Sequence, residues 1–309
     1  MPKDFISVAD WSADDLLRML ERAQQLRRLH RADKRPQTLQ GRTLAMYFEK
    51  PSLRTHVTFE AGMAQLGGHA VLLRPEQVGI GTRETPRDVA LNLSRWVDGI
   101  MARTFSHDLV CELAKHATIP IINGLTDLLH PCQAMADLQT IAGVMNPRQA
   151  TLAYVGDGNN VAHSLILLAA VLGMRIRVAT PASHRPDLGV MSQAEDLGAE
   201  SGAEIFWTDD PLAAVKGVDF IYTDTWTSMG QEDEAEQRRE IFARYQVNQG
   251  LIEHAPDARL MHCLPAHRGE EITGELLDGP RSLVYEQAEN RLHSQKAVLE
   301  AVMLTSSAP

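Results

Sequence analysis

The stretch TLAMYFEKPSLRTH, residues 43–56, predicts the repeating unit of the fold. Thr43 to Phe48 is apolar, as expected of a buried strand, and Ser52 can cap a helix that extends to Leu66. Two glycines then end this helix, and a second strand-like run covers His69 to Leu73. A strand, a helix and a strand in this order are typical of a parallel sheet covered by helices.

The same alternation continues along the chain. Further strands are expected at 99–103, 119–123, 152–155, 176–179, 204–207, 220–223, 260–264 and 283–285, and further helices at 12–30, 86–96, 107–117, 132–145, 161–172, 189–201, 211–216 and 288–304. Asn146 and Pro147 interrupt the alternation once, and 309 residues are enough for about two domains. The sequence therefore predicts an α/β protein with two doubly wound parallel-sheet domains that have helices on both faces.

Composition excludes several classes of protein. A net charge of −10 and 23% charged residues are ordinary for a globular protein and argue against nucleic acid as a partner. The three cysteines are far apart and form no C-x-x-C pair, so neither a disulfide framework nor a zinc finger is expected. No apolar stretch is long enough to span a bilayer and no secretory signal is visible, so we expect a cytoplasmic protein without a membrane partner.

Ligands bind sheets of this kind outside the carboxyl ends of the strands, so the loops at those ends are candidate sites. After the first strand, Ser52 and Thr55 offer hydroxyl groups, Arg54 offers a two-pronged guanidinium, and the start of a helix favours a phosphate. A capping serine beside a surface arginine would explain the same residues without a ligand. No Walker A pattern is present, so a nucleoside triphosphate is not indicated.

Four further residues could bind an anion or a carbonyl oxygen. Arg103 ends a predicted strand, and His130 and Gln133 lie where a helix begins. Arg291 lies near the start of the last helix. Each could equally be a surface or capping residue, but convergence of His130 and Gln133 on the same point as Arg54 would be hard to explain by capping alone.

The second half of the chain offers polar loops of a different kind. Residues 156–160, GDGNN, follow a strand but lack the G-x-G-x-x-G spacing, and no acidic residue ends the next strand, so a dinucleotide cofactor is not expected. Asn160 could instead bind a small polar ligand. The loop from Asp224 to Gly230 and the acidic helix after it suit a mobile lid that closes over an amine-bearing ligand.

The histidines and the cysteine near residue 263 first suggest a metal site, with His262, Cys263 and His267 as ligands. His262 and Cys263 are adjacent on a predicted strand, however, and should point to opposite faces. We therefore expect no metal, and no direct pairing of this cysteine with that histidine. The bond between Leu264 and Pro265 is a candidate cis peptide.

Five local signatures, in this order, resemble the aspartate/ornithine transcarbamoylase family, and within it the ornithine carbamoyltransferases. They are SLRT at 52–55, HPCQ at 130–133, GDGNN at 156–160, the Asp224 to Gly230 loop with SMG at 228–230, and HCLP at 262–265. The resemblance extends from about residue 45 to residue 298. It implies transfer of the carbamoyl group of carbamoyl phosphate to the side-chain amine of L-ornithine, giving citrulline and phosphate in arginine biosynthesis, without a cofactor.

The resemblance also implies domains and residue roles. Carbamoyl phosphate is expected in a domain of residues 1–140, joined by a helix at 288–309, and ornithine in a domain of residues 148–287. Ligands of carbamoyl phosphate would be Ser52, Leu53, Arg54, Thr55, Gln77, Arg103, His130, Gln133, Cys263, Leu264 and Arg291, with Gln77 reaching from a neighbouring subunit. Ligands of ornithine would be Asn160, Asp224, Ser228 and Met229. The catalytic residues would be Arg54, Arg103, His130, Asp224, Cys263 and Arg291, in a homotrimer or a multiple of trimers.

Two residues depart from the commonest pattern of the family. Leu53 replaces a threonine, and His56 replaces an arginine, which removes a permanent charge beside the expected phosphate. The sequence leaves two alternatives open. One is a different amine substrate, such as putrescine or an acylated ornithine, and the other is a relative that binds its ligands without turnover.

Overall fold

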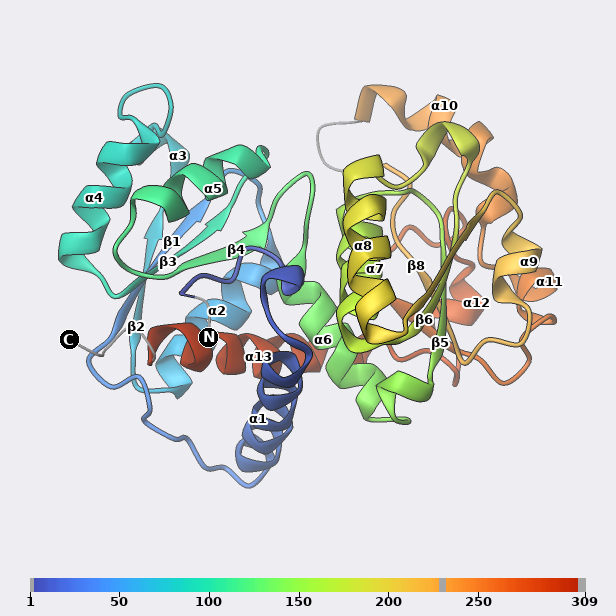
Figure 1. Ribbon diagram of the computed structural model, residues 1–309, viewed down its shortest axis with the longest axis horizontal. Coiled ribbons are helices and arrows are strands. Elements are labelled where there is room, and N and C mark those ends of the chain that lie inside the picture. The colour runs from blue at the N-terminus through green and yellow to red at the C-terminus, as the bar shows by residue number, and fades with distance from the viewer. Residues whose placement is uncertain (1–2, 228–231, 305–309) are drawn as a thin grey trace. The chain divides into compact units, whose positions relative to one another are not determined.

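Two α/β units make up the chain, and the computed structural model describes residues 3–227 and 232–304 (Figure 1). One unit comprises Met1–Gln139 with Glu289–Pro309, and the other comprises Thr140–Ala288. The chain passes from one unit to the other inside two helices, α6 (Pro131–Ala142) and α13 (Val284–Met303). Within the described ranges, no helix has the length and apolar character needed to cross a membrane.

The first unit is built on a four-stranded parallel sheet. Its strands are β1 (Thr43–Phe48), β2 (His69–Leu73), β3 (Gly99–Arg103) and β4 (Ile121–Leu125), in the order β2-β1-β3-β4. The chain order reverses between β1 and β3, and Phe48 pairs with Arg103 at the carboxyl ends of these strands. A ligand crevice opens at such a switch point, so the loops after β1 and β3 form the first candidate site.

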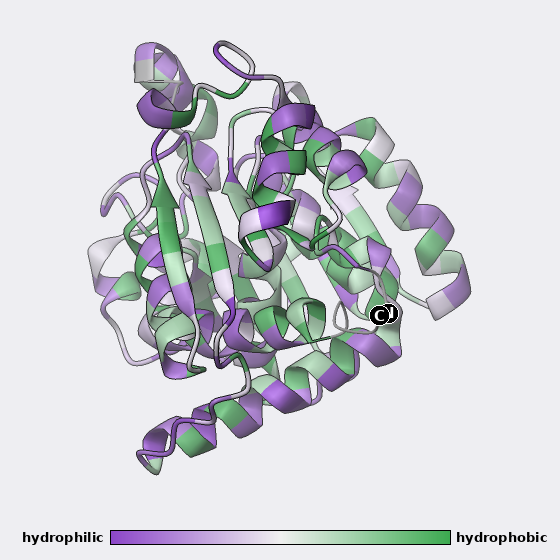
Figure 2. Cartoon of the chain, turned by 90° about the vertical axis from the view of Figure 1, so that its left-hand side faces the viewer, coloured by the Kyte–Doolittle hydropathy of each residue, from purple (hydrophilic) through white to green (hydrophobic). Residues whose placement is uncertain are grey.

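Side-chain caps decide where helices of the first unit begin. The Ser12 hydroxyl accepts a hydrogen bond from the Asp15 amide at the start of α1 (Ala13–Arg31). The Ser52 hydroxyl accepts one from the Thr55 amide at the start of α2 (Leu53–Gln65). Figure 2 shows largely hydrophobic strands among helices of mixed hydropathy, as expected for helices with one buried face. The remaining helices of this unit are α3 (Pro75–Val78), α4 (Pro86–Trp96), α5 (His107–His116) and the 3-10 turn η1 (Val8–Asp10).

The second unit contains a five-stranded parallel sheet in the order β7-β6-β5-β8-β9. Its strands are β5 (Thr151–Val155), β6 (Arg175–Ala179), β7 (Glu204–Thr208), β8 (Phe220–Thr223) and β9 (Arg259–His262). The chain order reverses between β5 and β8, which places the second switch point at the loops after these two strands. Both candidate sites therefore follow from strand order.

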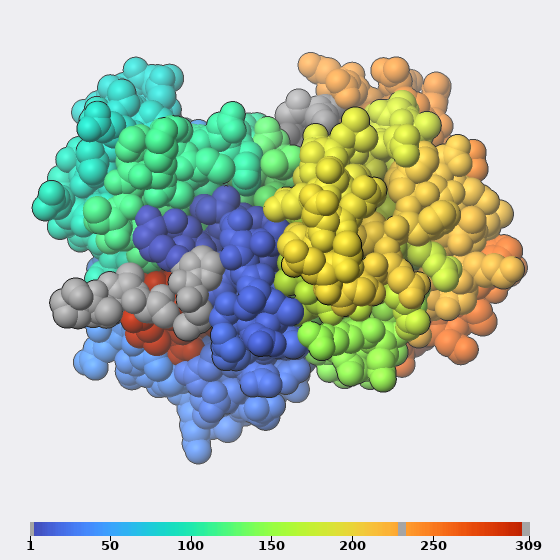
Figure 3. Space-filling model, viewed as in Figure 1, coloured from blue at the N-terminus to red at the C-terminus, as the bar shows by residue number. Residues whose placement is uncertain are grey.

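Helices lie on both faces of the second sheet. Helices α7 (Asn160–Leu172) and α8 (Leu188–Ser201) pack together on one face, with residues 161–172 of α7 all buried and α8 at the surface (Figures 1 and 3). The opposite face is covered by α9 (Pro211–Val215), α11 (Gln249–Ile252) and α12 (Gly274–Leu277). The other elements are α10 (Ala235–Phe242) and the 3-10 turns η2 (Pro147–Gln149), η3 (Ala182–His184), η4 (Glu232–Glu234) and η5 (Ala243–Tyr245).

The predicted fold class is confirmed, and β1, β2, β3, β8 and α4 have the predicted bounds. Three strand predictions are wrong by two residues or more. The strand expected at 119–123 is β4, which begins and ends two residues later. β9 stops at His262 because side chains then replace the strand ladder: the His262 amide donates to Gln287, and the Leu264 amide donates to the His262 ring. Residues 283–285 are not a strand, because α13 already starts at Val284. Of these three residues, Leu283 alone donates a backbone hydrogen bond to β9, at the Leu260 carbonyl. The four-residue helices α3 and α12 were not predicted, being too short to show a helical period.

In the first unit, a hydrogen bond joins the first helix to the last one next to a buried histidine. Glu289 of α13 accepts from Arg27 of α1 at 2.8 Å. One turn further along α13, His293 is fully buried, and its ring centroid lies 5.2 Å from that of His30. Burial, reinforced by the charge of Lys296, lowers the pKa of the His293 imidazole to about 3. The folded chain therefore keeps this side chain neutral.

Replacing His293 with glutamine should flatten the dependence of stability on pH. An unfolded histidine titrates near pH 6.5. His293 therefore costs nothing above that pH and destabilises the fold progressively as the pH falls from about 6.5 toward 3. Between pH 7 and pH 5 this group should remove up to about 2 kcal/mol from the free energy of unfolding. Urea unfolding at both pH values measures it: His293→Gln should lose less stability than the wild type, and an equal loss would contradict the assignment.

Candidate active site

The start of α2 forms the candidate site of the first unit. Thr55 is fully buried, and its hydroxyl accepts from Nη1 of Arg103 at 3.3 Å and from Nη2 of Arg291 at 3.2 Å. Arg103 is 6% exposed and Arg291 is 2% exposed. Arg291 also donates to Oε1 of Gln133 at 2.7 Å. Residues far apart in sequence thus bring two buried guanidinium groups to one hydroxyl.

His130 belongs to the same group of side chains. It is buried, and burial followed by the charges of Arg291, Arg103 and Arg54 holds the pKa of its imidazole well below the usual value. The ring is therefore neutral near pH 7 and can donate one N–H to an oxygen atom. Arg54, Thr55, Arg103, His130 and Arg291, here called the anion cluster, form with the start of α2 an electropositive site that suits a phosphate or a developing oxyanion.

Lys50 adds a buried positive charge that the sequence analysis missed. Its side chain comes from the loop after β1, is only 8% exposed, and places Nζ 4.3 Å from the centroid of the Phe105 ring. Burial, followed by the nearby charge of Arg103, lowers the pKa of this ammonium group. Its place two residues before Ser52 could have indicated that Lys50 belongs to the site, but a lysine in a loop is normally exposed.

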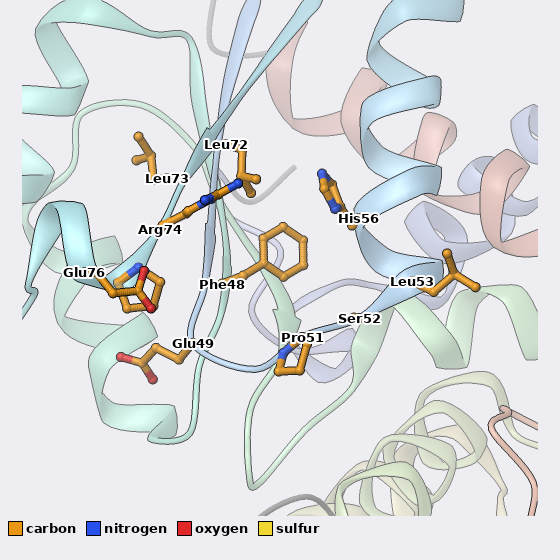
Figure 4. Close-up of a pocket in the computed structure, with 11 residues that line it drawn as sticks. Phe48, Glu49, Pro51, Ser52, Leu53, His56, Leu72, Leu73, Arg74 and Glu76 are labelled. Carbon is orange, nitrogen blue, oxygen red and sulfur yellow. The ribbon is translucent and has the colours of Figure 1, made fainter.

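Ser52 and Leu53 also line a hollow of about 430 Å³ on the first unit (Figure 4). The ring of Phe48, at the end of β1, lies 5.5 Å from the ring of His56 in this hollow. Nε2 of His56 lies 3.2 Å from a carboxylate oxygen of Glu60, one turn further along α2. The described lining includes no member of the anion cluster, so the hollow adjoins the cluster through Ser52 and Leu53.

Asp224 is the centre of the second switch point. It is 7% exposed and follows β8. Its two carboxylate oxygens accept from the Cys263 thiol and from Nδ2 of Asn159, each at 2.8 Å. Asn159 in turn caps α7 by accepting from two amides of its first turn. The structure therefore brings together Asp224, Cys263 and the loop that ends at Asn160, while Ser228 and Met229 lie outside the described residues.

The prediction that His262 and Cys263 point to opposite faces is wrong. Because β9 ends at His262, the strand alternation does not reach Cys263, and the ligand atoms of Asp224, His262 and Cys263 lie within 4.8 Å of one another. Both ring nitrogens of His262 are nevertheless used: Nδ1 accepts from the Leu264 amide at 2.8 Å, and Nε2 lies 3.0 Å from Oε1 of Glu271. An accepting Nδ1 means that Nε2 bears the proton. The His262 ring therefore orients the backbone at Leu264, whose bond to Pro265 is cis.

Arg238 of α10 joins the loops at the second switch point. Its guanidinium is buried, pairs with the Asp157 carboxylate after β5 and donates to the Trp226 carbonyl after β8. The same group lies over the Phe242 ring, 5.2 Å from its centroid. Despite this pairing, burial raises the pKa of Asp157 to about 6. The described part of the segment that was expected to form a lid is thus anchored through one arginine.

Replacing Arg238 with leucine should lower the free energy of unfolding by about 3–5 kcal/mol, because Asp157 would remain as a buried charge without its partner. The loss should be smaller at pH 5 than at pH 8, because the pKa of Asp157 is about 6 even beside Arg238 and the carboxyl group is mostly protonated at pH 5. Urea unfolding at pH 8 and pH 5 tests both statements. Arg239→Leu is the matched control, since this neighbouring arginine pairs with Glu270 at the surface and should contribute less than about 1 kcal/mol. Equal losses in the two variants would exclude the buried pair as the cause.

Two family models match consecutive parts of the chain. The one described as "Aspartate/ornithine carbamoyltransferase, carbamoyl-P binding domain" matches residues 3–143. The one described as "Aspartate/ornithine carbamoyltransferase, Asp/Orn binding domain" matches residues 148–302. Together they cover nearly the whole chain.

Relatives and solved structures agree with these matches. The ornithine carbamoyltransferase of Anoxybacillus flavithermus is 51% identical over 303 residues, which cover 97% of this chain and 96% of the relative. The anabolic ornithine carbamoyltransferase of Pyrococcus furiosus is 50% identical with the same coverage. A solved ornithine carbamoyltransferase from Pyrococcus furiosus has a TM-score of 0.93 and 49% identity, with 97% of both chains covered. One from Thermus thermophilus has a TM-score of 0.87 and 45% identity, with 98% of this chain and 99% of that chain covered. This chain belongs to the aspartate/ornithine carbamoyltransferase family.

Proposed function

We propose that this carbamoyltransferase moves the carbamoyl group of carbamoyl phosphate to the side-chain amine of L-ornithine, giving L-citrulline and phosphate. The observation that supports this most directly is the anion cluster, where buried Arg103 and Arg291 enclose Thr55 in the part of the chain that matches the carbamoyl-P binding domain. Relatives named ornithine carbamoyltransferase are about half identical to it over nearly its full length.

The start of α2 would bind the phosphate. Carbamoyl phosphate bears up to about two negative charges near neutral pH, and the helix N-terminus with two guanidinium groups offsets them. The Ser52 hydroxyl accepts from the Thr55 amide and therefore keeps its own hydrogen for donation to a phosphate oxygen. The proposed phosphate ligands are Ser52, Arg54, Thr55, Arg103 and the backbone amide of Leu53.

The anion cluster would also stabilise the reaction's transition state. When an amine attacks the carbamoyl carbon, the carbonyl oxygen gains negative charge. Neutral His130 can donate its N–H to that oxygen, and the hydroxyl of Thr55 and the guanidinium of Arg291 can do the same. The carbon–oxygen bond to phosphate then breaks, and the departing phosphate takes the proton that the amine nitrogen loses and leaves as the hydrogen phosphate dianion. No covalent intermediate with the enzyme is needed for this sequence.

Asp224 would hold the amine. Ornithine presents an ammonium group that must lose a proton before it attacks, and a carboxylate already fixed by Cys263 and Asn159 can orient it. Asn160 would bind the α-carboxylate or α-amine end. The further roles that the family resemblance implies for Gln133, Leu264, Ser228 and Met229 stay predictions.

Arginine biosynthesis in the cytoplasm is the setting that we propose. The word "anabolic" in the name of the Pyrococcus furiosus relative supports the biosynthetic direction. None of the three cysteines, Cys111, Cys132 and Cys263, forms a disulfide bond within the described residues, which is typical of a reducing compartment.

Product formation with four amines tests the function. Carbamoyl phosphate is supplied with ornithine, putrescine, N-acetylornithine or aspartate, and the carbamoylated amine and phosphate are quantified together. We expect citrulline and phosphate in equal amounts from ornithine and little product from the other three. Preference for another amine would preserve the carbamoyl-phosphate half of the proposal and remove the ornithine half. Folded protein that is inactive with all four amines would contradict both halves and favour a relative that only binds.

A homotrimer, or a multiple of trimers, is the assembly that we propose. Helix α2 exposes two apolar side chains one turn apart, Leu53 at 75% and Val57 at 51%, and the adjoining edge strand β2 exposes Val71 at 38%. Grouped exposed apolar side chains are typical of protein–protein contacts. Gln77, which the family resemblance places in a neighbouring subunit's site, is exposed on α3.

Subunit mixing tests the trimer and the role of Gln77 together. Arg54→Ala and Gln77→Ala should each lower kcat/KM by about 10²-fold or more, because each removes a donor to the anion. When the two variants are dissociated and reassembled together, activity should return, since a Gln77→Ala subunit keeps its own Arg54 and receives Gln77 from its neighbour. Arg54→Ala mixed with Arg103→Ala is the control and should stay inactive. No recovery in the first mixture would contradict a shared site.

A further inference from the structure

The chain after β9 folds into a tight loop, residues 267–272, that contains none of the residues assigned to a substrate. The Glu270 amide donates to the His267 carbonyl at 2.9 Å. The Gly269 amide donates to the Ile272 carbonyl, also at 2.9 Å. Nε2 of Gln246 secures the loop from outside, because it donates to the carbonyls of Gly269 and Glu270 at 2.9 Å. The backbone of this loop is therefore held in one conformation by its own fold.

Three side chains of the 267–272 loop converge. Nδ1 of His267 lies 4.0 Å from Oε2 of Glu270 and 4.0 Å from Oε2 of Glu271, and the three ligand atoms lie within 4.8 Å of one another. The His267 side chain is 50% exposed, that of Glu270 is 26% exposed, and that of Glu271 is fully buried. A small ion could therefore reach the buried carboxylate from solvent along His267.

The buried carboxylate of Glu271 is only half satisfied. Its Oε1 accepts from the His267 amide at 2.6 Å and faces Nε2 of His262 at 3.0 Å. Its Oε2 is buried and has no hydrogen-bond partner among the residues that the structure describes. The 4.0 Å to the His267 ring is too long for a hydrogen bond. Leaving a buried carboxylate oxygen without a partner is costly, so this arrangement indicates a missing positive group.

We propose that His267, Glu270 and Glu271 bind one divalent transition-metal ion. One imidazole nitrogen and two carboxylate oxygens suit Zn²⁺, Mn²⁺ or Co²⁺ better than Mg²⁺ or Ca²⁺, which prefer oxygen alone. Such ligands lie about 2.0–2.2 Å from the metal, so two ligands of one ion can be no more than about 4.4 Å apart. The observed 4.0 Å separations therefore need only small side-chain rotations.

A neighbouring arginine orients the second carboxylate of this site. Nη2 of Arg239 lies 2.9 Å from Oε1 of Glu270, so that oxygen is engaged and Oε2 remains directed at His267. Water would complete the coordination on the exposed side of the loop. The site thus combines two carboxylates that have hydrogen-bond partners with one half-exposed imidazole.

The bound ion would support the backbone of the candidate active site through Glu271. Holding Glu271 holds the His262 ring, and the other nitrogen of that ring accepts from the Leu264 amide. We expect the metal to raise the melting temperature without being required for carbamoyl transfer. The inference does not rest on the proposed function, because ion binding is measured directly.

A second group of side chains, Asp224, His262 and Cys263, must be distinguished from this site, since its ligand atoms are equally close. Both ring nitrogens of His262 are already hydrogen-bonded, and the Cys263 thiol is bonded to Asp224. A cobalt ion reports which group is occupied, because a thiolate ligand produces a charge-transfer absorption that nitrogen and oxygen ligands do not.

Titration of the chelator-treated full chain with Zn²⁺ and Co²⁺ tests the proposal. Calorimetry and thermal unfolding should show one ion per chain, bound about tenfold or more weakly by His267→Ala and by Glu270→Gln. Cys263→Ser should bind as the wild type does, and Co²⁺ should show no thiolate absorption. Glu275→Gln, which removes an exposed acid on nearby α12, is the matched control and should also bind normally.

Three results would overturn the proposal. The first is that the wild type shows neither stoichiometric binding nor a shift in melting temperature. The second is that binding survives in His267→Ala. The third is that binding disappears in Cys263→Ser and the wild type shows a thiolate band. His267 and Glu270 lie at the surface of a loop that its backbone already holds, so both variants should fold, and circular dichroism verifies this.

Discussion

The first unit depends on one constraint, which is that several positive charges must stay buried around the hydroxyl of Thr55. Arg103 and Arg291 are almost fully buried, and Lys50 is 8% exposed beside them. Like charges repel more strongly away from water, so such a group persists only where rigid elements hold it and an anion offsets it. Strand β3 holds Arg103, and α13 holds Arg291. Because α13 is tied to α1 through Glu289, the first helix of the chain supports the anion cluster.

The same positive charges decide the state of His130. An isolated histidine would be partly protonated near neutral pH, and a protonated ring would add a further charge to the cluster. Burial and the surrounding arginines remove that proton, which leaves a neutral donor. A neutral ring can still donate its N–H to a developing oxyanion. In the reaction that we propose, the arginines would therefore both attract the anion and keep His130 a neutral donor.

The positions of most strands along the chain were predictable from the sequence because caps, glycines and apolar runs are local signals. Residues 43–48, 99–103 and 220–223 are bounded by such signals, but the order of the strands within each sheet, and with it the position of both switch points, is visible only in the structure. The errors have a different origin. The end of β9 depends on Gln287, and the burial of Lys50 depends on Phe105, both distant in sequence. Nothing local in the pair Glu270-Glu271 indicates which carboxylate is buried beneath His262, since that depends on tertiary packing.

Two buried carboxylates on neighbouring loops of the second unit differ in whether a charged partner inside the protein offsets their charge. Asp157 is paired with the guanidinium of Arg238, so its charge is offset inside the protein. Asp224 is bonded, within the described residues, to a thiol and a carboxamide, which are neutral donors that fix its position without offsetting its charge. A buried carboxylate held by neutral donors is stabilised further by a cation from outside. An arginine in place of Asn159 would offset the charge of Asp224 and make this carboxylate resemble Asp157. The amide and the thiol therefore leave the charge of Asp224 for a cation to offset, which is the role that we propose for the ammonium group of the substrate, whereas the charge of Asp157 is already offset by Arg238.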